Sequence, residues 1–86
     1  MSGDSAHRTS DMTLVAYLAT VGINNAKMEL SGDLVVWVLP ASGALSRELA
    51  KYERGDCRVE PGNLMRQVVR VRTAMFQFKE RAQRVA

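Results

Sequence analysis

The sequence predicts a small α+β domain in which helices cover a small antiparallel sheet. Two capped segments with apolar residues at helical spacing, one hairpin signal and a long amphipathic C-terminal segment lead to this prediction. The 86 residues are enough for one domain, and 47% hydrophobic with 24% charged residues is typical of globular proteins. The expected order is helix, β-hairpin, helix, short strand and long C-terminal helix.

The N-terminal third should contain a short leader followed by a helix. Residues 1–8 are small and polar, so we expect a flexible leader there and a single domain over residues 9–86. Ser10 or Asp11 can cap the first turn of the helix, and Gly22 can end it in the left-handed conformation. Ile23 should then pack back on Leu18.

The next two segments, 26–30 and 34–39, are separated by the turn signal Ser-Gly-Asp. Gly32 fits a two-residue hairpin loop, either Ser31-Gly32 or Gly32-Asp33. Both choices place two sets of apolar residues on one side of the sheet, namely Ala26, Met28 and Leu30 with Val35, Trp37 and Leu39. The second strand also carries Leu34, Val36 and Val38 on its other face, which predicts a strand that is central or covered on both faces.

A second helix and a short strand should follow. Ser42 can cap this helix and Gly55 can end it, with Leu45, Leu49 and Tyr52 on its buried face. Residues 56–60 then read as a short third strand with Cys57 and Val59 facing inward. The last helix begins at Pro61, where the missing amide is harmless.

The last helix has two apolar stripes. The first follows a four-three spacing and fits both a core face and a three-heptad seam; it consists of Leu64, Val68, Val71, Met75, Phe78, Ala82 and Val85. The second stripe consists of Met65, Val69 and Phe76. So wide an apolar arc predicts contact with more than one surface: a core, and either a second copy of the chain or another protein. The interface residues expected for that contact are Met65, Val69, Phe76, Ala82 and Val85.

The basic residues are concentrated in the same helix. Residues 61–86 carry six basic side chains and one acid, a net charge of +5, whereas the preceding sixty carry six basic and eight acidic residues, a net charge of −2. The basic set is Arg66, Arg70, Arg72, Lys79, Arg81 and Arg84. Four of these arginines fall within about 60° of one helix face. They predict contact with nucleic-acid phosphates, DNA or RNA; the alternative is that they only keep a core helix soluble.

Arg72 lies between the two apolar stripes, so a partly buried guanidinium with an acceptor is expected there. The candidate acceptors are Glu48, Glu53, Asp56 or an external phosphate.

No residue pattern predicts catalysis, a cofactor or a metal site. The carboxylates have no recognisable acid-base partner and should be solvated, while Trp37 should pack in the core. Cys57 and His7 are the only residues of their types, so neither a disulfide nor a zinc site is expected. No apolar run is long enough for a bilayer, and the N-terminus lacks a signal peptide, so we expect a cytoplasmic protein without a membrane partner.

Three stretches, RTSDMTLVAYLATVG, LVVWVLP and ELAKYERGDCRVEPGNLMRQVVRVRTAMF, together resemble a family of phage-borne and bacterial proteins described as a domain of unknown function. The resemblance covers about 70 residues, from Thr9 to Phe78. It rests on Thr9, Ser10, Asp11, Leu14, Leu18, Gly22, Trp37, Tyr52, Gly55 and Pro61. Glu60 and the arginine-rich segment after Phe78 depart from the family pattern. The resemblance implies a phage or prophage source, hence the host-cell cytoplasm, and brings no catalytic residues.

These observations favour a small non-enzymatic, phage-type accessory protein that binds nucleic acid through the basic face of its last helix. The alternative is a protein-interaction or self-association module that uses the apolar stripes of the same helix.

Overall fold

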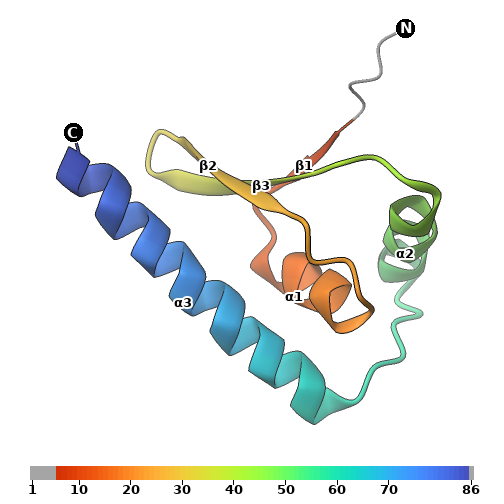
Figure 1. The fold of residues 1–86 in the computed structure, drawn as a ribbon. Helices are drawn as coiled ribbons and strands as arrows, with labels where there is room; N and C mark the ends of the chain where they lie inside the picture. The colour runs from red at the N-terminus through yellow and green to blue at the C-terminus, as the bar shows by residue number, and fades with distance from the viewer. Residues whose placement is uncertain (1–5, 86) are drawn as a thin grey trace, which may run out of the picture.

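The computed structural model describes residues 6–85, the last of these by its backbone alone. The elements, in chain order, are β1 (His7–Thr9), α1 (Met12–Thr20), β2 (Lys27–Ser31), β3 (Leu34–Leu39), α2 (Gly43–Arg54) and α3 (Pro61–Val85). The strands form an antiparallel sheet in the order β1-β3-β2, and the three helices lie on one side of it (Figure 1). The predicted α+β class is confirmed.

The hairpin between β2 and β3 has one of the two predicted registers. Ser31 pairs with Leu34, so the loop is Gly32-Asp33, and Gly32 has a φ of +65°. A glycine at the first loop position is typical of a type II′ turn, which matches the natural twist of the strands. Met28 lies opposite Trp37, which confirms the predicted core side of the hairpin.

The third strand is not where the sequence places it. Residues 56–60 have no secondary structure, although Cys57 and Val59 do pack against the core as predicted. The third strand is β1, in which His7 pairs with Leu39 and Thr9 with Trp37. Its position corrects the predicted leader, since His7 and Arg8 belong to the sheet, while residues 1–5 lie outside the described part. With β1 and β2 on its two edges, β3 offers no free edge to residues 56–60.

Helix α1 lies at the centre of the domain, and its middle is buried on all sides. Five consecutive residues, Leu14 to Leu18, are buried. Leu14 and Leu18 contact a cluster that includes Leu39 and Leu45, whereas Val15 contacts Trp37 and the side of α3. The spacing of the apolar residues predicts one buried face, made of Met12, Val15, Leu18 and Ala19 with Leu14 beside it. That face is too narrow, because Ala16 and Tyr17 are buried as well.

Both ends of α1 are fixed by the residues that the sequence indicates. The Asp11 side chain accepts hydrogen bonds from the amides of Thr13 and Leu14, at 3.1 and 3.2 Å. At the other end Gly22 has a φ of +96°, and the Ile23 amide donates to the Leu18 carbonyl at 2.8 Å. This pattern is a Schellman motif, in which the residue after the glycine returns to the last turn. Ile23 packs on the core cluster that contains Leu18, as predicted.

Helices α1 and α2 are joined by two reciprocal tyrosine-carboxylate hydrogen bonds. Tyr17 of α1 donates to Glu48 of α2 at 2.6 Å, and Tyr52 of α2 donates to Asp11 at 3.0 Å. The two rings lie 5.8 Å apart between centroids. Glu48 is therefore an internal acceptor, not the solvated carboxylate that the sequence suggests.

The same contacts raise the pKa values of both tyrosines. For Tyr17 the hydrogen bond to Glu48 is the main cause and burial adds to it; for Tyr52, burial and then the hydrogen bond to Asp11 raise the pKa to about 12. Both hydroxyls thus stay protonated, and remain donors, at pH values above the ordinary tyrosine pKa of about 10. The stability that their hydrogen bonds contribute is complete below that pH and is lost as the pH rises through the raised pKa values.

Nearby residues also fix both ends of α2 and the start of α3. Ser42 accepts from the Leu45 amide at 3.0 Å, and Gly55 ends α2 with a φ of +73°. Glu60 caps α3, because its carboxylate accepts from the Gly62 and Asn63 amides at 3.2 and 2.8 Å. The connection from α2 to α3 is thus a short segment with a defined end on each side.

The outer face of the sheet carries none of the helices in Figure 1. Leu34 is 55% exposed there, while Val36 and Val38 are half-buried. Arg8 of β1 and Glu29 of β2 form an ion pair of 2.8 Å between the two edge strands, across β3. The prediction for β3 is thus met by a central position in the sheet, with helices on one face only.

Candidate functional site

The predicted core stripe of α3 is the side that packs on the domain. Leu64 contacts the cluster around Leu18, and Val71, Met75 and Phe78 contact the cluster around Trp37. Ala82 is half-buried on the same stripe, and the Val85 side chain lies outside the described part of the structure. The rotation of α3 about its axis is therefore fixed, and the opposite side of the helix faces solvent.

The second apolar stripe lies on that solvent-facing side. Met65, Val69 and Phe76 are 58%, 51% and 58% exposed, the largest exposures among the big apolar residues of the helix. Of the interface residues predicted from the sequence, these three share an open surface, whereas Ala82 belongs to the core side.

Four arginines follow one edge of this stripe. Arg66, Arg70, Arg81 and Arg84 are all exposed. Arg84 lies 3.8 Å from Glu80, and Arg66 donates to the side chain of Asn63. Within the described residues, Arg66, Arg70 and Arg81 have no carboxylate within ion-pair distance. Helical spacing brings these four together as predicted, but the Asn63 partner of Arg66, three residues earlier, was not foreseen.

Arg72 and Lys79 follow the other edge of the stripe. The external phosphate that the sequence also suggests as an acceptor stays a prediction. Arg72 is exposed, however, and within the described residues neither Glu48, Glu53 nor Asp56 lies at ion-pair distance from it. The expected partly buried guanidinium is therefore wrong. The reason is the rotation of α3, which places its second apolar stripe in solvent and leaves Arg72 beside an open surface. Lys79 is half-buried.

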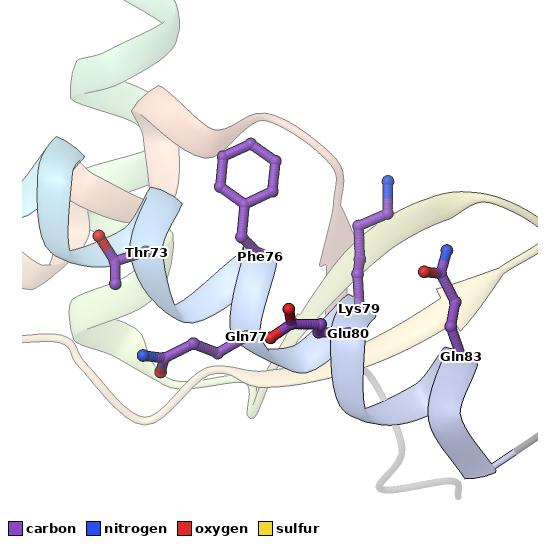
Figure 2. Close-up of a pocket in the computed structure, with 6 residues that line it drawn as sticks. All are labelled: Thr73, Phe76, Gln77, Lys79, Glu80 and Gln83. Carbon is purple, nitrogen blue, oxygen red and sulfur yellow. The ribbon is translucent and has the colours of Figure 1, made fainter.

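A shallow hollow of about 480 Å³ lies beside Phe76. Figure 2 shows the Phe76 ring projecting from α3, with Lys79 and Gln83 to one side of it and Thr73 and Gln77 to the other. All the residues that line this hollow belong to the same helix. Because one helix alone forms it, the hollow is open to solvent. It could serve as a contact area for another molecule, but it does not enclose a reaction site.

Asp56 and Cys57 both have contacts within the domain that account for them without a chemical role. Asp56 lies 3.9 Å from Arg54 and 3.4 Å from Arg58, and Cys57 is half-buried against the core. Within residues 6–84, no three His, Cys, Asp or Glu side chains are grouped as a metal ion would require.

The chain matches no protein-family model, no curated protein and no solved structure. The family resemblance described above therefore stays a prediction. Among the helices that the structure describes, none has the length and apolar character needed to cross a membrane.

Proposed function

We propose that this protein is a small, non-enzymatic, phage-type accessory protein that binds nucleic acid through the arginine row of α3, defined as Arg66, Arg70, Arg81 and Arg84. The observation that carries the proposal is the exposure of these four side chains on one helix face with a single neighbouring acid, Glu80. The like charges of these guanidinium groups repel one another, and a polyanion that lies against the row would offset this repulsion.

The dimensions of the row support a phosphate ligand. Arg66 and Arg84 are eighteen residues apart, which corresponds to roughly 27 Å along a helix. Guanidinium groups spread over this length can each reach a different phosphate of one nucleic-acid strand, and each can form paired hydrogen bonds to its oxygens. Arg72 and Lys79 lie outside the row and would contact only a ligand that also covers the apolar stripe.

Binding to labelled duplexes of two unrelated sequences tests this proposal. Because phosphate contacts position a protein without reading sequence, both duplexes should bind at low salt with similar Kd values. Fluorescence anisotropy of the labelled duplex is the measurement, with a labelled single strand of the same length in parallel. A lack of any saturable change at low salt, for duplexes and single strand alike, would exclude the proposal.

The exposed apolar stripe favours a second candidate function, self-association or docking of a protein partner on Met65, Val69 and Phe76. Exposed contiguous apolar side chains on small soluble proteins commonly mark contact surfaces. If two copies associate there, Phe76→Glu should convert a dimer into a monomer, with little loss of stability because Phe76 is 58% exposed. Sedimentation of both proteins over a range of concentrations is the measurement. A wild-type mass that stays monomeric at every concentration argues against the homodimer.

A further inference from the structure

A cleft of about 310 Å³ lies between α1, α3 and the hairpin. Two buried residues, Val15 and Trp37, line its inner part. Three alanines, Ala19, Ala26 and Ala74, line it from α1, from the residues before β2 and from α3. The small alanine side chains do not fill the space between these elements. The cleft therefore extends inward as far as the core. This volume is near the lower end of the range for small-molecule sites, about 300 to 1,000 Å³.

The cleft is lined by one cationic side chain and two side-chain amides, all of which can donate hydrogen bonds. They are Asn24, Gln67 and Arg70, and none of the residues that line the cleft is acidic. Within the described residues, Arg70 has no carboxylate at ion-pair distance. A guanidinium and two amides next to an apolar space are complementary to a ligand with an anionic oxygen-bearing end and an apolar body.

We infer that this cleft binds a small carboxylate whose body is aromatic or aliphatic. The body would lie against Trp37 and the alanines, and the carboxylate would accept paired hydrogen bonds from Arg70, with Gln67 and Asn24 as further donors. A carboxylate fits better than a phosphate, because its single charge matches the single cation of the cleft and the planar guanidinium matches its two oxygens. This inference does not depend on nucleic-acid binding.

Trp37 is the only tryptophan of the chain, so its fluorescence reports directly on the cleft. Titration with phenylbutyrate should give a saturable change in this fluorescence. Phenylbutanol has the same apolar body without the charge, and it should bind at least about tenfold more weakly, because it loses the charge-assisted hydrogen bonds. Equal binding of the acid and the alcohol, or no saturable change up to the solubility limit of the acid, would overturn the inference.

Three variants separate this site from the arginine row as a whole. Arg70→Gln should raise the Kd for phenylbutyrate by at least about tenfold, and Ala74→Leu should abolish binding by filling the cleft. Arg66→Gln is the matched control, since Arg66 does not line the cleft, and it should leave the Kd for phenylbutyrate unchanged. Under the proposed function, Arg66→Gln should weaken only the binding of nucleic acid. Each of the two proposals can therefore fail while the other holds. Unchanged phenylbutyrate binding by Arg70→Gln, an exposed substitution that does not threaten folding, contradicts the site.

Discussion

Replacing Arg66, Arg70, Arg81 and Arg84 together with glutamine should weaken the binding of duplex DNA by roughly a thousandfold at fixed low salt. Glutamine keeps helix propensity and can still donate a hydrogen bond, but it removes the charge. At about 1 kcal/mol for each lost phosphate contact, four contacts correspond to a change of that size in Kd. Anisotropy of the labelled duplex gives the Kd of both proteins, and circular dichroism confirms that the variant is folded.

The chain contains a matched control for this variant. Arg8, Arg47, Arg54 and Arg58 are exposed and lie on β1, on α2 and in the segment that follows α2. Their replacement with glutamine lowers the net charge by the same amount but leaves α3 intact. This control should change the Kd by less than about tenfold, since only long-range attraction is altered. Equal losses in the two variants would mean that net charge, and not the arginine row, governs binding.

Leu18→Ala should lower the free energy of unfolding by about 2 to 5 kcal/mol. Leu18 is fully buried at the centre of the domain, where α1 meets the sheet and both other helices. Removing its side chain leaves a cavity that a small domain cannot easily close, and the loss is a large part of the about 5 to 15 kcal/mol typical of such domains. Urea unfolding followed by Trp37 fluorescence measures the effect.

Leu34→Ala is the corresponding control for that substitution. Leu34 is 55% exposed on the outer face of the sheet, so its truncation should cost less than about 1 kcal/mol. Similar losses at Leu18 and Leu34 would contradict the arrangement in which the helices cover only one face of the sheet.

Features that depend on neighbouring residues could be predicted from the sequence. Asp11, Gly22, Ser42 and Gly55 fix the ends of α1 and α2 because caps act on amides and carbonyls within a few residues. In the same way Gly32 limited the hairpin to two possible two-residue loops, of which the structure has Gly32-Asp33.

Features that depend on distant residues could not be predicted in this way. The segment of β1 has no apolar alternation of its own and becomes a strand because β3 has an open edge beside it. The burial of Tyr17 and the role of Glu48 arise from the docking of α2 on α1, thirty-one residues apart in sequence. No local pattern signals either contact.

The candidate site likewise has features that could be predicted from the sequence and features that could not. Helical spacing was enough to group Arg66, Arg70, Arg81 and Arg84 on one face of α3 and to separate the two apolar stripes. The four-three spacing also predicted which stripe packs on the core, but the exposure of Arg72 depends on how α3 rests on α1 and the sheet. The cleft beside Trp37 is still less visible in sequence, because its walls come from several elements.

The salt dependence of duplex binding tests most directly whether the arginine row holds phosphates. The proposal predicts that log Kobs for the wild-type protein falls against log salt concentration with a slope of about −3 to −4, as expected for four phosphate contacts. The slope should stay in this range for the variant lacking Arg8, Arg47, Arg54 and Arg58, and approach zero for the variant lacking the arginine row. A wild-type slope near zero, or one that survives the loss of the row, would contradict the account.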